Sequence, residues 1–461
     1  MFRFYNSASR RVEEFVPQKK TVGIYSCGPT VYHFVHIGNM RSFLLSDVLR
    51  RALTFGGYRV KQVMNITDVG HLVSDADEGE DKMEKAVRRE GKTAWDIAAF
   101  YTDAFLADCK RLHLLPPSKM PRATDHIKEQ VALVAALEKG GHVYRTSDGM
   151  YFDTATFSAY GKLSGQKLDQ KQGGKRIATT GKRNDSDFAL WKFSQGVKRE
   201  MEWESPWGVG FPGWHIECSA MSRKYLGQPF DIHTGGIDHL PVHHENEIAQ
   251  SEAAYGVPLA HFWMHGEFLV LGEGEKISKS KDNFLTLQTL IDRGYDPLAF
   301  RLFCFSAHYR TPLTFSWQAM DAAQNALNNL RQTVRRWDKP KGGCADFEKR
   351  FMAAVENDLD MPKALAVVWE MVKADLPTAA KAASLFRCNG VLGLDLQKYI
   401  AKPMKAEKPS AEAAKLLSQR LQARANKDWK ESDHLRDELQ KLGWGVLDGK
   451  DGGMTLVKSQ P

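Results

Sequence analysis

The sequence predicts an α/β protein: a parallel sheet split by an inserted segment and followed by mostly α-helical C-terminal domains. Three observations support this fold class. A strand, a helix and a second strand follow one another near the N-terminus, which is typical of a parallel βαβ unit. The stretch 118–204 differs in character from its flanks, and beyond residue 286 the apolar residues recur mainly at helical spacing.

The βαβ unit spans about forty residues. Val22–Ser26 is a short buried strand that Gly28-Pro29 interrupts. Residues 38–53 form the expected helix, which Gly56-Gly57 ends, and Tyr58–Met64 then alternates like a second strand. The helix has these apolar residues on its core face: Met40, Phe43, Leu44, Val48 and Leu49.

The inserted segment is rich in glycine pairs and positive charge. Between Lys162 and Asn184 there are seven Lys or Arg and one acidic residue, Asp169. We therefore expect an inserted sub-domain with a mobile basic loop. After it, Phe230–His233 reads as a strand, and residues 243–254 as a helix.

The C-terminal third is expected to be helical. The predicted helical stretches are 319–337, 347–386 and 411–442, with a linker marked by Pro403 and Pro409. A hairpin is expected to follow, from Trp444 to about residue 457.

Composition limits the class of protein. The 461 residues carry 64 Lys or Arg against 56 Asp or Glu, a net charge of +8 that favours either a polyanionic partner or a merely basic soluble enzyme. No apolar run reaches 18 residues, and the N-terminus lacks the apolar region of a signal peptide, so we expect no membrane span and a cytoplasmic location. Six scattered cysteines do not predict a disulfide scaffold. They are Cys27, Cys109, Cys218, Cys304, Cys344 and Cys388.

The first chemical signal is His36-Ile-Gly-Asn39, directly before the first long helix. A helix N-terminus offers unpaired N–H groups to a phosphate, Gly38 permits close approach, and His36 can donate a hydrogen bond. The alternative is a capping turn with an incidental histidine.

The second signal is Lys276-Ile-Ser-Lys-Ser280 in a glycine-containing stretch. Lys276 and Lys279 are three residues apart, so both ammonium groups can reach one polyphosphate and stabilise a pyrophosphate leaving group. The alternative is a solvated basic loop.

The third signal is a cluster of metal-binding residue types. His243 and Glu247 are four apart and share one helix face, with Cys218 as a possible third ligand and Cys27 as a fourth. We expect the adjacent His244 to point elsewhere. In the alternative interpretation, the cysteines are small buried apolar residues. Five of the fifteen histidines lie between residues 215 and 244: His215, His233, His239, His243 and His244.

Together, these motifs make the chain resemble the class I aminoacyl-tRNA synthetases, with their HIGH and KMSKS signatures in the same order. The chain more specifically resembles the cysteinyl-tRNA synthetase family over nearly its whole length. Seven stretches carry that resemblance: 25–32, 65–68, 122–127, 187–192, 212–221, 231–238 and 243–250. The C-terminal stretch 424–439 is similar to the family's anticodon-binding region.

The resemblance implies one Zn²⁺ per chain, held by Cys27, Cys218, His243 and Glu247, and Mg²⁺ bound with ATP. It also assigns the other residues. The implied catalytic residues are His36, Lys276 and Lys279. The implied ATP-binding residues are His36, Gly38, Asn39, Gly236, Asp238 and Lys279. The implied cysteine-binding residues are Thr67, Trp214 and His233.

Two residues depart from the class signatures. Asn39 replaces the second histidine of HIGH, which keeps a hydrogen-bond donor but puts any imidazolium role there in doubt. Ile277 replaces the methionine of KMSKS, which we expect only to repack an apolar contact.

The implied partners are ATP, L-cysteine and tRNA(Cys), with no membrane and a monomeric chain. Two other readings stay open: a paralogous ligase that joins cysteine to an amino-sugar inositol, and a non-catalytic RNA-binding relative. The expected domains are a Rossmann-like catalytic domain (1–117 and 205–257), an inserted sub-domain (118–204), a KMSKS-loop and stem-contact region (258–318), a helical bundle (319–405) and an anticodon-binding domain (406–461).

Overall fold

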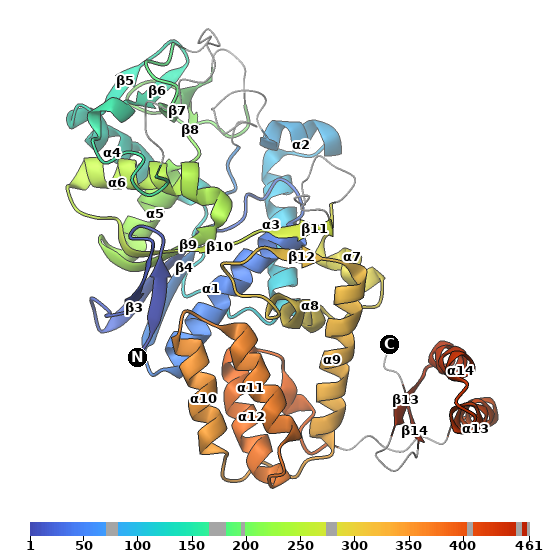
Figure 1. Cartoon of the computed structure of the whole chain (residues 1–461). Coiled ribbons are helices and arrows are strands. Elements are labelled where there is room, and N and C mark those ends of the chain that lie inside the picture. The colour runs from blue at the N-terminus through green and yellow to red at the C-terminus, as the bar shows by residue number, and fades with distance from the viewer. Residues whose placement is uncertain are drawn as a thin grey trace.

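The computed structural model describes residues 1–70, 82–165, 181–194, 199–272, 284–402, 409–448 and 454–458 (Figure 1). Its central sheet has four parallel strands in the order β10-β9-β3-β4. These strands are β3 (Thr21–Ser26), β4 (Arg59–Met64), β9 (Phe230–Gly236) and β10 (Ala260–Gly266). The predicted parallel sheet is therefore confirmed.

Helix α1 (Ile37–Phe55) connects β3 to β4, as the apolar spacing predicts. It begins where the His36 ring accepts a hydrogen bond from the Asn39 N–H, and Gly56 follows as its C-cap. One face, including Met40, Leu44 and Leu49, is buried in the main core. The helix thereby points its N-terminus to the carboxyl ends of the parallel strands.

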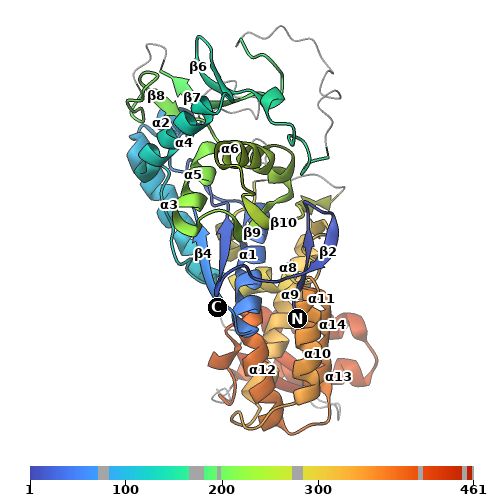
Figure 2. The ribbon, with the colours of Figure 1, turned by 90° about the vertical axis from the view of Figure 1, so that its left-hand side faces the viewer.

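The order of the strands creates a switch point between β3 and β9. From β3 the chain moves to β4 on one side, and it later adds β9 and β10 on the other side. In open α/β sheets, the crevice at such a point is where ligands bind. Figure 2 shows this sheet between α1 and the inserted elements above it.

The elements between β4 and β9 pack on two different cores. They are α2 (Lys82–Glu90), α3 (Ala94–Arg111), α4 (Ile127–Lys139), the antiparallel strands β5 (Val143–Arg145), β6 (Gly149–Phe152), β7 (Phe188–Phe193) and β8 (Gly210–Pro212), and α5 (Ile216–Leu226). Helices α2 and α3 pack on the main core, whereas α4, β6, β7 and α5 contribute to a second core. Trp191 and Phe152 are buried in that core together with residues of α4. Most of the predicted basic loop, residues 166–180, lies outside the described residues.

A short hairpin precedes the sheet, and mostly helical elements follow it. The hairpin is β1 (Arg3–Asn6) and β2 (Arg11–Glu14). The later elements are α6 (Glu245–Tyr255), β11 (Leu269–Leu271), α7 (Leu287–Asp292), α8 (Pro297–Cys304), β12 (Leu313–Phe315), α9 (Trp317–Arg335), α10 (Ala345–Glu356), α11 (Met361–Lys373) and α12 (Thr378–Leu392). Among the described residues, no helix combines the length and apolarity needed to cross a membrane.

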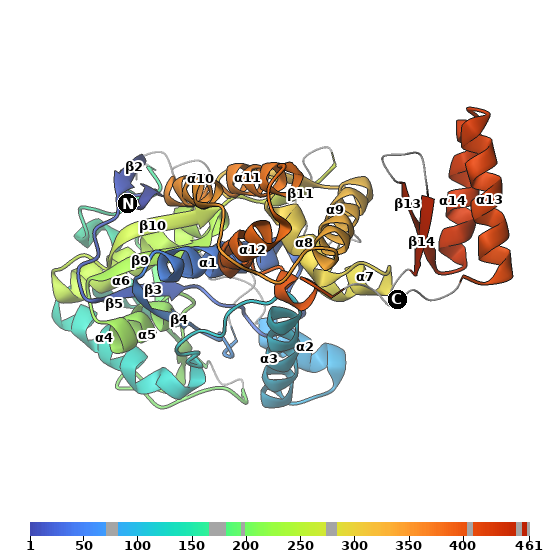
Figure 3. The same cartoon turned by 90° about the horizontal axis from the view of Figure 1, so that it is seen from below.

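Two helices and a hairpin between residues 409 and 458 form a C-terminal unit, which stands apart from the other elements in Figure 3. Its antiparallel hairpin, β13 (Trp444–Asp448) with β14 (Met454–Lys458), confirms the predicted hairpin. The single helix expected over 411–442 is wrong, because two helices are present, α13 (Ala411–Ala425) and α14 (Trp429–Lys441). Lys427 between them has a φ of +59°, a left-handed conformation that ends a helix, and Asp428 caps the next one.

A fully buried ion pair ties α1 to the helical region. The Arg301 guanidinium lies 2.6 Å from Asp47 Oδ2 and also donates to the carbonyls of Leu392 and Leu112. Asp47 lies on α1, Arg301 on α8 and Leu392 at the end of α12. Burial alone would raise the pKa of Asp47, but Arg301 and Arg51 outweigh it and lower that pKa. One guanidinium thus joins three segments that are far apart in the chain to α8.

We predict that Asp47→Asn lowers the free energy of unfolding by about 3–5 kcal/mol at pH 7, because it leaves the Arg301 charge without its partner. Since the folded pKa of Asp47 is depressed, this stabilisation is present above the unfolded pKa, about 3.9, and is lost as pH falls through the folded value. Urea unfolding at pH 7 and at a series of pH values below the unfolded pKa measures both effects. The exposed Asp375→Asn is the matched control, and equal stability of the two variants at pH 7 would contradict the prediction.

Candidate functional site

The candidate site lies where the carboxyl ends of β3, β4 and β9 meet the N-terminus of α1. Cys27 directly follows β3, and its N–H donates to the Thr234 carbonyl on β9. Thr67 follows β4, where its carbonyl accepts from the Val31 N–H. Residues from three strands and one helix are thereby held at a single edge of the sheet.

Four predicted metal ligands come together at this edge. The donor atoms of Cys27, Cys218, His243 and Glu247 all lie within 4.8 Å of one another, and all four residues are buried. Cys218 comes from the first turn of α5, and Glu247 from the first turn of α6. His243 lies in a π-helical turn, Leu240–His244, that precedes α6. The fold thus brings together residues separated by more than 200 positions.

His244 also faces this group, so the expectation that it points elsewhere is wrong. Its Nε2 lies 3.4 Å from Cys27 Sγ, and a second group of possible metal ligands consists of Cys27, His233, His244 and Glu247. The physical reason is the π turn, which is wider than an α turn and rotates less per residue. Neighbouring rings therefore diverge less, and the centroids of His243 and His244 are 5.8 Å apart.

The charges of the group depend on one another because all four residues are buried side by side. Burial alone would raise the pKa of Glu247, but His233 and His243 outweigh it and hold that pKa well below its usual value. Burial likewise opposes a charge on His243, yet Glu247 and Cys218 raise its pKa. Burial raises the pKa of Cys27, and Cys218 and Glu247 add to this effect.

This donor set fits a divalent metal ion. Two sulfurs, one imidazole nitrogen and one carboxylate oxygen are the ligand types of tetrahedral zinc sites. Four buried ionisable groups at such distances are costly without a compensating charge, and a dication would supply one to the two thiolates and the carboxylate.

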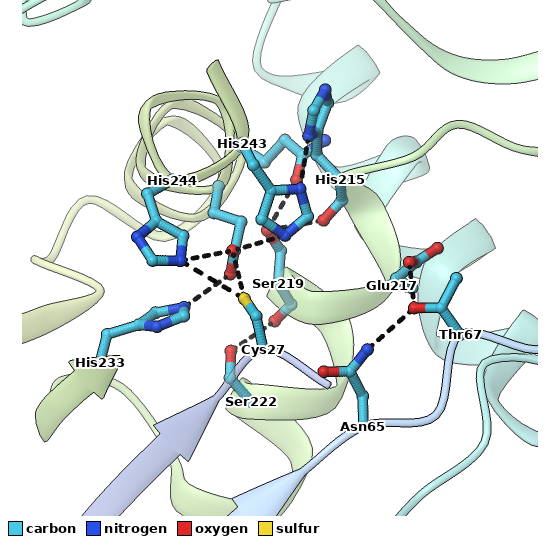
Figure 4. A network of polar contacts seen from close by, with 12 residues as sticks. Cys27, Asn65, Thr67, His215, Glu217, Ser219, Ser222, His233, His243 and His244 are labelled. Atoms are coloured by element: carbon cyan, nitrogen blue, oxygen red, sulfur yellow. Dashed lines mark hydrogen bonds and ion pairs between the residues drawn. The ribbon is translucent and has the colours of Figure 1, made fainter. Parts of the chain in front are cut away.

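Further histidines contact the four residues from outside (Figure 4). His233 Nε2 lies 3.0 Å from Glu247 Oε2, and His215 Nδ1 lies 2.9 Å from His243 Nδ1. Sequence reasoning assigned no role to His215, although the concentration of histidines between 215 and 244 was a visible signal. Sequence reasoning also missed His265, whose Nε2 lies 2.8 Å from His244 Nδ1.

The residues predicted to bind nucleotide surround the start of α1. His36 Nδ1 accepts the Asn39 N–H at 3.1 Å, which leaves the proton of a neutral ring on Nε2. A Cβ on Gly38 would lie 3.0 Å from the His36 ring, and one on Gly236 would lie 2.4 Å from Asp238 Oδ1. Both glycines therefore stand where a side chain would crowd the site.

Lys276 and Lys279 lie outside the described residues. The chain that follows them is held against the start of α1: the Ile37 N–H donates to the Leu285 carbonyl at 2.9 Å, and His36 pairs with Thr286 in an antiparallel bridge. The described chain that follows the second signature stretch is thus hydrogen-bonded to the first one.

The three predicted cysteine-binding residues differ in what their side chains contact. Thr67 Oγ1 donates to Glu217 at 2.7 Å, and His233 contacts Glu247. Trp214 is half-buried, and its ring centroid lies 5.2 Å from that of His243. Trp214 is therefore the one of the three that combines exposed surface with proximity to the candidate ligands.

Comparison with known proteins now defines the class. Residues 14–325 match the family model described as the class I (C) tRNA synthetase catalytic domain, and residues 408–453 match the cysteinyl-tRNA ligase anticodon-binding domain. The fold is similar to that of the methionyl-tRNA synthetase from Mycobacterium tuberculosis, with a TM-score of 0.55 and 13% identity over 87% of this chain and 94% of that one.

Sequence comparison then gives the family. The cysteine–tRNA ligase 1 of Burkholderia lata is 53% identical over 99% of this chain and 98% of its own length. The cysteine–tRNA ligase of Treponema denticola is 40% identical over 99% of both chains. This chain belongs to the cysteine–tRNA ligase family, which confirms the resemblance inferred from its motifs.

Proposed function

We propose that this chain activates L-cysteine with ATP and transfers it to the 3′ end of tRNA(Cys). The observation that carries the proposal is the buried Cys27, Cys218, His243 and Glu247 group beside the N-terminus of α1, in a chain of this family. In this proposal the four residues hold a metal that selects the thiol, and the neighbouring helix N-terminus binds phosphate.

The proposed reaction has two steps. The carboxylate of cysteine attacks the α-phosphorus of ATP, the bond to the β,γ-pyrophosphate breaks, and cysteinyl-adenylate forms. The 2′-hydroxyl of the terminal adenosine of the tRNA then attacks the activated carbonyl, which releases AMP. A carboxylate is already a nucleophile at neutral pH, so the first step needs positioning and charge stabilisation rather than a general base.

The proposed nucleotide contacts follow from the start of α1. His36, through Nε2–H, and the N–H groups at Gly38 and Asn39 hold phosphate oxygens, while Gly236 and Asp238 contact the adenosine. Lys276 and Lys279 stabilise the charge that grows on the pyrophosphate, together with Mg²⁺ bound to ATP.

Zinc is the proposed metal, held by Cys27, Cys218, His243 and Glu247. When bound, it lowers the pKa of a coordinated thiol and accepts it as the thiolate. A serine hydroxyl ionises far less readily and is a poorer ligand, whereas size alone would separate the two amino acids weakly. We propose that Trp214 covers the bound cysteine, with Thr67 and His233 completing the pocket.

The C-terminal unit is the proposed anticodon-binding domain. Trp429 is 58% exposed and available to stack on a base, whereas Trp444 is 7% exposed and belongs to the local core. Arg420 is buried, and its Nε donates to the Ser432 carbonyl. Arg424, whose guanidinium lies 5.8 Å from the Trp429 ring, is the better candidate for contact with tRNA.

We propose that the chain acts as a monomer in the cytoplasm and that the domain boundaries expected from the sequence apply. Six cysteines without disulfide bonds suit a reducing compartment. The match of residues 408–453 to an anticodon-binding domain disfavours the amino-sugar ligase alternative.

Cys218→Ser should lower zinc affinity and cysteine activation together, because a hydroxyl is a poor zinc ligand. We expect the loss of zinc affinity to exceed the roughly 10–100-fold typical of residues that only support a ligand. Metal analysis and cysteine-dependent pyrophosphate exchange measure the two effects. Cys109→Ser, outside the site, is the control; a zinc-free Cys218→Ser enzyme with normal exchange would refute the role of the metal.

Lys279→Ala should reduce kcat for pyrophosphate exchange by roughly 100-fold or more, as for loss of one transition-state donor. Because that contact forms only in the transition state, kcat and kcat/KM should fall together, with little change in the KM for cysteine. Lys281→Ala, in the same stretch, is the matched control. An unchanged kcat in Lys279→Ala would rule out the proposed role.

Deletion from residue 406 onward should separate the two steps. Every residue proposed for adenylate formation precedes residue 285, so cysteine-dependent exchange should persist. Charging of tRNA should fall at least about tenfold, since each lost base stack is worth about 1–3 kcal/mol. Tight binding of full-length protein to tRNA should also weaken with added salt. Equal charging by the truncated and full-length enzymes would remove the C-terminal unit from the proposal.

A further inference from the structure

A chain of hydrogen-bonded side chains leads away from the candidate metal group. His244 Nε2 lies 3.4 Å from Cys27 Sγ, and His244 Nδ1 lies 2.8 Å from His265 Nε2. On its other side, His265 Nδ1 lies 2.8 Å from Ser7 Oγ. All three outer residues are buried, and they come from the π turn, from β10 and from the loop after β1.

We propose that Ser7 and His265 are positioning residues that keep the proton of His244 on Nε2, so that this N–H donates to the Cys27 thiolate. The inference rests on the proposed metal site and deepens it. It assigns a role to two residues that no sequence motif marks.

The donor and acceptor of each hydrogen bond between Cys27 and Ser7 follow from the chemistry of the groups. A metal-bound thiolate can only accept, so His244 must donate to it through Nε2–H. A neutral imidazole has one donor and one acceptor, so His244 Nδ1 must accept from His265 Nε2–H. His265 Nδ1 must then accept as well, and the Ser7 hydroxyl is the donor that lies in reach.

The space for the His244 ring is provided by Gly235 on β9. A Cβ at residue 235 would lie 2.7 Å from His244 Cε1 and 2.8 Å from His239 Nδ1, which is shorter than van der Waals contact. Gly235 is also the residue paired with His265 in the parallel register of β9 and β10. The ring therefore lies over a position where any side chain would displace it from Cys27.

Ser7 is fixed by the docking of the β1–β2 hairpin against β10. The Ser7 N–H donates to the Trp263 carbonyl at 2.9 Å. The Asn6 side chain accepts from the Trp263 N–H and donates to the His261 carbonyl. The Ser7 hydroxyl is thus positioned by hydrogen bonds between residues 6–7 and residues 261 and 263 of β10, the strand that carries His265.

The chemical consequence concerns the charge on the sulfur. A hydrogen bond from outside the ligand sphere orients a ligand and alters how strongly it donates to the metal. Donation from His244 withdraws charge from the Cys27 thiolate, which leaves the metal a better acceptor for the thiolate of the substrate. His244 also belongs to the second possible ligand group, so the variants below distinguish a donor to Cys27 from a ligand of the metal.

The test uses protein reconstituted with Co²⁺, whose thiolate-to-metal charge-transfer band reports on the cysteine ligands. In Ser7→Ala we expect that band to shift, the Kd for Co²⁺ to rise several-fold, and the KM for cysteine to rise more than kcat falls, within the roughly 10–100-fold known for such outer contacts. Ser7→Thr keeps the hydroxyl and should restore all three. Ser9→Ala is the control, because its hydroxyl contacts only the Asn6 carbonyl among the described contacts.

Three outcomes would overturn the inference. If Ser7→Ala keeps the charge-transfer band and the Kd for Co²⁺ of the unsubstituted protein, the hydrogen bonds from Ser7 do not affect the metal. Failure of Ser7→Thr to restore them shows that packing, not the hydroxyl, is responsible. His244→Ala that melts like the unsubstituted protein but binds no Co²⁺ shows that His244 is a ligand. Failure of the unsubstituted protein to bind Co²⁺ would instead refute the metal site itself.

Discussion

The burial of the Glu247 carboxylate is the constraint on which the site depends. Glu247 is fully buried, and it lies within 3.1 Å of His243 on its own segment and 3.0 Å of His233 on β9. A carboxylate without such partners would be too costly to bury, so β9, the π turn and α6 must meet in one arrangement. Cys27 joins them only because β3 pairs with β9.

The same sheet geometry sets the distance between amino-acid selection and phosphate binding. Cys27 and the first turn of α1 are separated by only nine residues, and both lie at the switch point of the sheet. The buried Asp47–Arg301 pair then fixes α1 against α8 and α12. A displacement of α8 or α12 would therefore also displace α1, the helix that begins after His36. The helical region and the start of α1 are thus mechanically connected through this ion pair.

The sequence predicted the features that depend on local pattern or on residue type. The βαβ unit follows from apolar spacing, and the four donor residues follow from the spacing of His243 and Glu247 and from the motifs. The sequence could not predict what depends on local backbone geometry or tertiary packing. His244 faces the site because of a π turn, Arg420 is buried by contacts with α14, and Lys427 breaks a helix through one left-handed residue. None of these leaves a periodic signal.

Selection of a thiol over a hydroxyl requires a metal that still attracts an anion. In the proposed site two thiolates and a carboxylate would outweigh the charge of a dication, which would weaken its hold on a further thiolate. The structure surrounds these anions with donors: His233 contacts Glu247, and His244 contacts Cys27. Burial lowers the pKa of His244, and that of His265 to about 3, so both rings are neutral and act as hydrogen-bond donors rather than counter-ions. Neutral donors disperse ligand charge without adding a cation that would compete for the substrate thiolate. The histidine-rich surroundings therefore suit the proposed selection by a metal, and the hydrogen bonds from Cys27 through His244 and His265 extend them to Ser7.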